Sequence, residues 1–90
     1  MSALDASVEV KNRLGLHLRA ASTLAQTVNR FKSAVTLTRG KNQVSARSVT
    51  GLMMLGAAQG TKLKVRVEGE DAAEAMTAIK RVFEERFGEE

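Results

Sequence analysis

The sequence predicts an α+β fold, an open-faced β-sandwich in which a four-stranded antiparallel sheet carries three helices on one face, in the order βαββαβα. Three observations lead to this prediction. Apolar and polar residues alternate in four segments, as in strands with one buried face. Apolar residues recur at helical spacing in three other segments. The 90 residues contain no repeat and no linker, so we expect a single domain over residues 1–90.

The first strand is expected over residues 7–11, where Val8 and Val10 alternate with polar neighbours. Residues 12–15 form a turn into the first helix, whose apolar positions begin at Leu18 and continue at Ala21, Leu24, Ala25, Val28 and Phe31. A hairpin follows, with Val35 and Leu37 in one strand, a turn at residues 39–42, and Val44 and Ala46 in the returning strand.

The second half of the chain predicts two helices and the clearest strand. Ser48 stands at an N-cap position before a short apolar helix over residues 49–55, with Gly56 as its C-cap. Residues 61–68 place Leu63, Val65 and Val67 opposite Lys62, Lys64 and Arg66, which predicts a sheet with one solvated face. Asp71 and Glu74 have capping-box spacing for the last helix, which we expect Gly88 to end and whose apolar stripe is Ala72, Ala75, Met76, Ile79 and Phe83.

The composition excludes several classes of site. With three Phe and no Tyr, Trp, Pro or Cys, the core must be aliphatic, and neither a disulfide nor a cysteine-based metal site or nucleophile is possible. A single histidine with no acid beside it argues against a zinc site, so we expect no metal and no cofactor. The sequence shows no signal peptide pattern and no membrane-spanning segment. We expect a cytoplasmic monomer that does not insert into a membrane.

His17, the single histidine, lies where the first helix begins. The first N–H groups of a helix have no intrahelical partner and carry partial positive charge, so they favour an anion. Arg19 adds a guanidinium at the same end, and a phosphoryl group on His17 would be stabilised there. Taken alone, a histidine beside a helix start is more often a cap or surface residue, so both interpretations stay open at this point.

Ser48 and the second helix provide a candidate docking surface. We expect the N-termini of the first two helices to lie near one another, with His17, Arg19 and Ser48 on a common surface. Val49 and Met53 are four residues apart and share a helix face, whereas Leu52 and Leu55 are better placed for the core. We expect an apolar patch beside His17 with a basic rim of Arg19, Arg47 and Lys41; in the alternative, Met53 fills the core.

The charges are separated along the chain. No Asp or Glu occurs between Val10 and Val67, and the net charge is +4. A segment in which every charged residue is Lys or Arg favours association with an acidic macromolecule. A small nucleic-acid-binding domain or a ligand-sensing regulatory domain is therefore an alternative function, but the solvated sheet face has no aromatic residue for base stacking. With no nucleophile and base pair, an enzyme with its own active site fits least.

Two segments resemble a known family. Residues 15–21, Gly-Leu-His-Leu-Arg-Ala-Ala, and residues 47–56, Arg-Ser-Val-Thr-Gly-Leu-Met-Met-Leu-Gly, are similar to the two characteristic segments of the HPr family, the histidine-containing phosphocarriers of the bacterial phosphoenolpyruvate-dependent phosphotransferase system. The resemblance extends over about residues 8–87. It departs at Leu18 and Ala20, where the usual motif has alanine and proline. These changes leave open a role in a regulatory pathway rather than in sugar uptake.

The resemblance implies a phosphoryl carrier rather than an enzyme, with no nucleic-acid partner. His17 would accept a phosphoryl group on Nδ1 from phospho-enzyme I and pass it to a IIA component of the sugar or nitrogen branch. Arg19 would contact the phosphoryl group, and Ser48 would be the serine that an HPr kinase/phosphorylase modifies in some bacteria. The partner-docking residues would be Leu18, Arg47, Val49, Thr50 and Met53.

Overall fold

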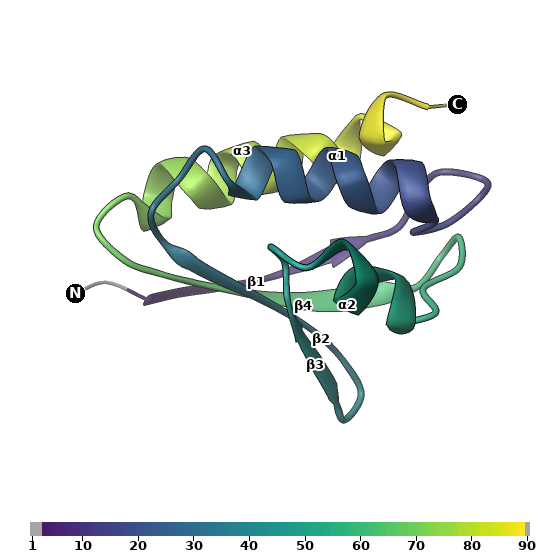
Figure 1. The fold of residues 1–90 in the computed structure, drawn as a ribbon, viewed down its shortest axis with the longest axis horizontal. Coiled ribbons are helices and arrows are strands. Elements are labelled where there is room, and N and C mark those ends of the chain that lie inside the picture. Colours follow the sequence, from purple (N-terminus) through teal and green to yellow (C-terminus); the bar gives the residue numbers. More distant parts are fainter. Residues whose placement is uncertain (1–2, 90) are drawn as a thin grey trace.

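A computed structural model, which describes residues 3–89, confirms the predicted architecture (Figure 1). The four strands form one antiparallel sheet in the order β1-β4-β2-β3. The elements are β1 (Ala3–Glu9), α1 (Leu18–Val28), β2 (Ala34–Arg39), β3 (Asn42–Ser45), α2 (Val49–Met54), β4 (Lys62–Glu68) and α3 (Ala72–Glu84), followed by a 3₁₀ turn, η1 (Arg86–Gly88).

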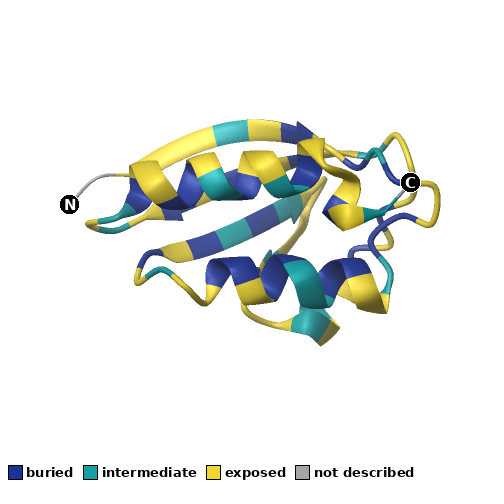
Figure 2. Ribbon diagram, turned by 90° about the horizontal axis from the view of Figure 1, so that it is seen from above, coloured by how far each residue is buried: buried dark blue, intermediate teal, exposed yellow. Residues whose placement is uncertain are grey.

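The helices and the sheet form two layers with a largely aliphatic core between them, which also takes in Phe83 and Phe87. α1 and α3 lie side by side over one face of the sheet, and α2 packs against α1 and β3 at the edge of this layer (Figures 1 and 2). In β4, Leu63, Val65 and Val67 are buried while the lysines and the arginine between them are exposed, as the alternation predicts. The helices contribute Leu24, Val28, Met76, Ile79 and Phe83 to the same core.

Several boundaries differ from the sequence prediction. α1 ends at Val28 rather than continuing to Phe31, and β3 ends at Ser45, before Ala46. β1 extends from Ala3 to Glu9 because it pairs along its whole length with β4, from Ala3 opposite Glu68 to Glu9 opposite Lys62. α3 ends at Glu84, well before Gly88. The chain turns there because Phe87 enters the core and packs edge-on against Phe83, with ring centroids 5.0 Å apart. This side-chain burial, rather than a terminal glycine, decides where the helix stops.

Asp71 does not act as the predicted capping-box residue. It precedes α3, but its side chain makes no capping hydrogen bond to that helix. Its carboxylate instead accepts hydrogen bonds from the backbone N–H groups of Lys32 (2.9 Å) and Ser33 (3.0 Å), and from the Ser33 hydroxyl. Asp71 therefore joins the start of α3 to the connection between α1 and β2. Gly69 allows this approach, since a Cβ there would lie 2.8 Å from the Ser33 Cα.

We predict that Asp71→Asn lowers stability at neutral pH, since the amide nitrogen cannot accept the hydrogen bond from the Lys32 N–H. The Ser33 hydroxyl, followed by the Lys32 and Ser33 N–H groups, lowers the pKa of Asp71 below its ordinary value of 3.8. A lowered folded-state pKa gives stability that is present above the unfolded-state pKa and is lost as the pH falls through the folded-state pKa.

Urea unfolding of Asp71→Asn and the parent between pH 7 and pH 2 measures this effect. The difference in unfolding free energy should be largest at pH 7 and should shrink below about pH 4 as the parent carboxyl becomes neutral. Glu70→Gln, which removes a neighbouring exposed carboxylate, is the matched control. An equal difference at every pH would show that the Asp71 charge is not involved.

Candidate functional site

His17 is the N-cap residue of α1, as the sequence predicts. Its backbone is extended (φ −84°, ψ −176°), and its carbonyl accepts the first helical hydrogen bond, from the Ala21 N–H at 2.8 Å. The ring Nδ1 accepts a long hydrogen bond of 3.4 Å from the Arg19 N–H. Because Nδ1 is an acceptor here, it carries a free electron pair and faces the N–H groups at the start of α1.

The loop before His17 is held by the segment that follows α2. The Leu16 N–H donates to the Ala57 carbonyl at 2.9 Å, and the Leu16 side chain is buried. Gly15 adopts a φ of +72°, and a Cβ at this position would lie 2.6 Å from the Ala57 oxygen. A side chain at position 15 is therefore excluded both by the backbone conformation and by space. This packing fixes the direction in which the chain delivers His17 to the helix.

Glu89 is a site residue that the sequence analysis missed. One of its carboxylate oxygens lies 2.7 Å from His17 Nε2, and the other accepts a hydrogen bond of 2.9 Å from the Asn12 side-chain amide. The same Asn12 nitrogen donates to the Gly15 carbonyl at 2.7 Å, and Asn12 is fully buried. Glu89 is 72 residues from His17 in sequence, so no local pattern signals the contact.

Glu89 is ionised near neutral pH. Burial acts to raise the pKa of its carboxyl, but the hydrogen bonds from Asn12 and His17 and the nearby charge of Arg19 outweigh burial and lower it. An ionised carboxylate accepts hydrogen bonds and donates none. His17 Nε2 therefore carries the proton in this contact, which is the tautomer that leaves Nδ1 free.

Arg19 supplies positive charge that is free to meet a ligand. No side chain of residues 3–89 forms a hydrogen bond or an ion pair with its guanidinium. His17 and Arg19 line a surface hollow of about 390 Å³, together with Arg13, Leu14, Gly88 and Glu89. An anion attached to the His17 ring would therefore meet a cationic fork and a helix N-terminus.

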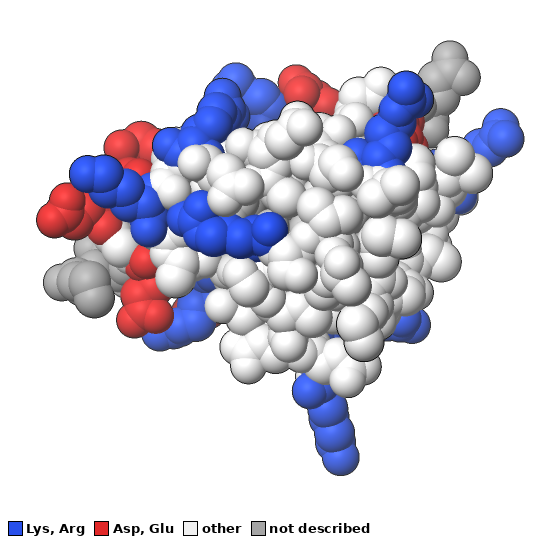
Figure 3. Space-filling model, viewed as in Figure 1, with Lys and Arg blue, Asp and Glu red and all other residues white. Residues whose placement is uncertain are grey.

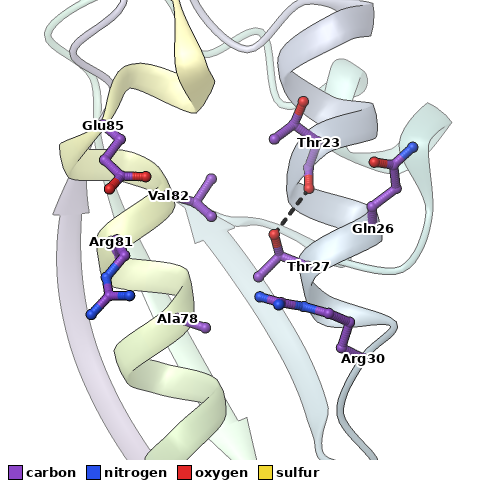
Figure 4. A pocket seen from close by; sticks show the side chains of 8 residues that line it. All are labelled: Thr23, Gln26, Thr27, Arg30, Ala78, Arg81, Val82 and Glu85. Carbon is purple, nitrogen blue, oxygen red and sulfur yellow. Dashed lines mark hydrogen bonds between the residues drawn. The ribbon is translucent and has the colours of Figure 1, made fainter.

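A second hollow, of about 420 Å³, lies between α1 and α3 (Figure 4). It is lined by Thr23, Gln26, Thr27, Arg30, Ala78, Arg81, Val82 and Glu85. The Thr27 hydroxyl is already engaged with the Thr23 carbonyl at 3.2 Å. None of the predicted site residues lines this hollow, so it is separate from the His17 site.

Ser48 is the N-cap of α2, as predicted. Its hydroxyl oxygen accepts a hydrogen bond of 2.9 Å from the Gly51 N–H, and the residue is exposed. Beside it, the Arg47 guanidinium donates to Asn29 Oδ1 (2.7 Å) and to the carbonyls of Phe31 (2.8 Å) and Ser33 (2.9 Å). Arg47 thus fastens the start of α2 to the segment that follows α1.

This contact corrects the predicted arrangement of the helices. The start of α2 lies beside the C-terminal end of α1, while Gly56 and Ala57, which follow α2, line a hollow together with His17. The two helix N-termini are therefore not adjacent. His17 and Ser48 lie toward opposite ends of α1, whose 11 residues span about 16 Å.

More large apolar side chains are exposed around His17 and on α2 than the sequence predicts. Leu52 and Leu55 are in the core as expected, and Val49 is half-buried against it. The exposed large apolar residues include Leu14, Leu18, Met53 and Met54, here called the apolar surface. Met53 is thus not in the core, and Leu14 and Met54 are additions to the prediction. Figure 3 shows an uncharged expanse over the side of α1 and α2, with Lys and Arg side chains around its edge.

Lys41 does not belong to the rim of this surface. It lies in the turn of the β2–β3 hairpin, which projects away from α1 in Figure 1. Within residues 3–89, none of the helices has the length and apolar character needed to span a membrane. No group of three or more His, Cys, Asp or Glu in that range is placed to hold a metal ion.

Known proteins resemble this chain over nearly its whole length. A family model described as the PTS HPr component phosphorylation site matches residues 4–85. Phosphocarrier protein HPr of Xylella fastidiosa is 45% identical over 97% of this chain and 98% of its own, and phosphocarrier protein NPr of Shewanella violacea is 37% identical over 99% and 98%. The crystal structure of HPr-C-His from Thermoanaerobacter tengcongensis superposes with a TM-score of 0.92 and 38% identity, covering 97% of this chain and 98% of that one.

Proposed function

The chain belongs to the HPr family and is a phosphocarrier of the phosphotransferase system rather than an enzyme, and from this premise we propose that His17 Nδ1 carries the phosphoryl group. The observation that supports His17 is the orientation of its ring, with Nδ1 turned to the start of α1 and the proton held on Nε2 by Glu89. The donor is phospho-enzyme I and the acceptor is a IIA component. The protein acts as a cytoplasmic monomer.

The transfer requires no additional reactant. The electron pair of Nδ1 attacks the phosphorus of phospho-enzyme I, and the bond between phosphorus and the donor atom breaks with its electrons returning to enzyme I. The long hydrogen bond from the Arg19 N–H gives way as the N–P bond forms. The N–H groups of the first turn of α1 and the Arg19 guanidinium then stabilise the phosphoryl oxygens.

Partners dock on the apolar surface and the residues beside it. Leu18 and Met53 are exposed and provide apolar contact, while Arg19 lies beside His17 at the edge. Val49, Thr50 and Arg47 extend the contact toward the start of α2, although the hydrogen bonds of Arg47 to Asn29 and Phe31 also give it a structural role. A small apolar surface with basic residues at its edge suits a partner that must bind, exchange a group and leave.

Ser48 is the proposed site of regulatory phosphorylation by an HPr kinase/phosphorylase. The residue is exposed, and as the N-cap it places a phosphate beside the free N–H groups of α2, where negative charge is tolerated. The phosphate adds about −1.5 to −2 charges at the end of the docking surface opposite His17. Regulation therefore acts on docking rather than on the chemistry at Nδ1.

We predict that His17→Ala folds normally and takes up no phosphate. The parent, incubated with phosphoenolpyruvate and cognate enzyme I, should gain one acid-labile phosphoryl group, detected by intact mass. Ser48→Ala is the matched control and should be phosphorylated like the parent. Phosphate uptake by His17→Ala would place the carrier atom elsewhere.

We also predict that Arg19→Ala slows phosphoryl transfer while leaving the melting temperature nearly unchanged. The guanidinium has no side-chain partner among residues 3–89, so its loss removes no contact of the fold. A hydrogen bond to a charged group contributes about 1.5 to 3 kcal/mol, which corresponds to a rate decrease of about 10- to 100-fold. Rapid-quench measurement of transfer from phospho-enzyme I tests this, with Arg81→Ala, an exposed arginine of α3 away from the His17 hollow, as the control. A rate equal to that of the parent would remove Arg19 from the site.

For Ser48, we predict that Ser48→Asp raises the KM that enzyme I shows for this protein, with kcat nearly unchanged. Asp is a good N-cap, so α2 is retained, but its charge disturbs the apolar and basic docking surface. Ser48→Asn caps the helix without the charge and is the control. Circular dichroism checks the fold, and an unchanged KM at both low and moderate salt would show that Ser48 is only a cap.

A further inference from the structure

Three side chains form a hydrogen-bonded series that ends on the nitrogen of His17 that would not carry phosphate. Asn12 donates to Glu89, and Glu89 in turn contacts His17 Nε2 at 2.7 Å. In catalytic sites, a carboxylate placed on one nitrogen of a histidine fixes the tautomer and the orientation of the ring. The two ring nitrogens of His17 face different surroundings, a carboxylate at Nε2 and a backbone N–H at Nδ1.

The end of the chain is folded in a way that directs Glu89 to His17. Arg86 and Phe87 both have left-handed backbone angles (φ 55° and 56°), which cost energy in residues with a side chain. Burial of Phe87 against Phe83 offsets this cost and reverses the direction of the chain. As a result, the Glu89 side chain is only 15% exposed, although it lies next to the last residue.

The orphaned oxygen of Asn12 supports the same interpretation. Asn12 is fully buried, and its Oδ1 has no hydrogen-bond partner in the part of the chain described, residues 3–89. An amide flip would give Oδ1 a place opposite the Gly15 carbonyl and the Glu89 carboxylate, where oxygen would face oxygen. The amide is therefore fixed in the orientation that donates to Glu89, at the cost of one unsatisfied acceptor.

We propose that Glu89 is a positioning residue for phosphoryl transfer, holding the His17 proton on Nε2 so that Nδ1 is the nucleophile and balancing the positive charge that the ring gains. The proposal rests on the proposed function of His17. When Nδ1 shares its electron pair with phosphorus, the ring becomes cationic while the proton stays on Nε2. Glu89 stays ionised throughout and transfers no proton. Asn12 acts one step further away, by holding Glu89.

The charges around the His17 ring agree with a role for Glu89 at Nε2 and for the phosphoryl group at Nδ1. Arg19 from α1 and Arg13 from the preceding loop line the same hollow, and among residues 3–89 Glu89 is the one acidic residue in that lining. The carboxylate sits at Nε2, whereas the start of α1 faces Nδ1. An incoming phosphoryl group thus approaches Nδ1 on the side where the helix terminus lies. The negative charge of Glu89 lies at Nε2, on the other side of the ring, and does not repel it.

The first measurement uses the unphosphorylated full chain and needs no partner. Long-range ¹H–¹⁵N correlation spectra of His17 at a pH where the ring is neutral should show the Nε2–H tautomer in the parent. Glu89→Ala should shift the ring toward a mixture of both tautomers. Glu89→Gln keeps an acceptor oxygen without the charge and should keep the Nε2–H tautomer. Glu85→Gln, which removes an exposed carboxylate of the same segment, should match the parent.

The second measurement is the rate of phosphoryl transfer from phospho-enzyme I. Loss of the group that orients a functional histidine typically costs about 10- to 100-fold, so Glu89→Ala should be slower by at least about 10-fold in kcat with little change in KM. Glu89→Gln should fall between Glu89→Ala and the parent because only the charge is lost. Melting temperatures of all variants serve as the check on folding.

The outcomes separate this inference from the proposed function. A parent-like tautomer or a parent-like kcat in Glu89→Ala would overturn the role of Glu89, as would faster transfer, which would make the carboxylate an inhibitor. If the parent itself gained no phosphate on His17, the proposed function would fail. The Nε2–H tautomer in the parent and its loss in Glu89→Ala, together with slower transfer, would establish the positioning role.

Discussion

A single layer of aliphatic side chains between the sheet and the pair α1 and α3 holds this fold together. The chain has no cysteine, and burial of one leucine or valine side chain contributes about 1.5 to 3 kcal/mol, so a protein of 90 residues depends on filling this layer completely. The layer forces both long helices onto one face of the sheet. Their ends therefore lie at the rim of the molecule, where a helix N-terminus can meet another protein without disturbing the core.

The two ends of α1 show how the same backbone groups serve different purposes. Beyond its C-terminal end, Asp71 accepts from the N–H groups of Lys32 and Ser33, and Arg47 donates to the carbonyls of Phe31 and Ser33. That end is fully occupied by internal partners and is structural. At the N-terminal end, the His17 ring is the one side chain of residues 3–89 that the first-turn N–H groups meet, through one long hydrogen bond. Stability is concentrated at one end of the helix, which leaves the other available for a ligand.

Much of this could be predicted from the sequence, because hydrophobic periodicity records which face of each element is buried. The alternation in residues 61–68 and the helical spacing after Leu18 placed the sheet and α1 correctly, and Ser48 is the cap that its position indicates. Asp71 was wrongly assigned because its partners lie 38 and 39 residues away, and Glu89 was missed because it is 72 residues from His17. Long-range hydrogen bonds leave no periodic trace in a sequence, and both errors concern such bonds.

The two departures from the usual family motif, Leu18 and Ala20, lie in different surroundings, since Leu18 is exposed and Ala20 is buried. Ala20 occupies the position of the usual proline and is fully buried in the first turn of α1. Alanine is an excellent helix former, so the helix does not need the ring of proline, and alanine brings an N–H that proline lacks. That N–H is one of the first-turn groups without an intrahelical partner, but Ala20 has no exposed surface, so the replacement adds no donor that an anion at the surface can reach. Leu18 is exposed and adds apolar area beside His17. The alanine thus keeps the start of α1 helical, while under the proposed function the leucine enlarges the apolar area that a partner meets beside His17.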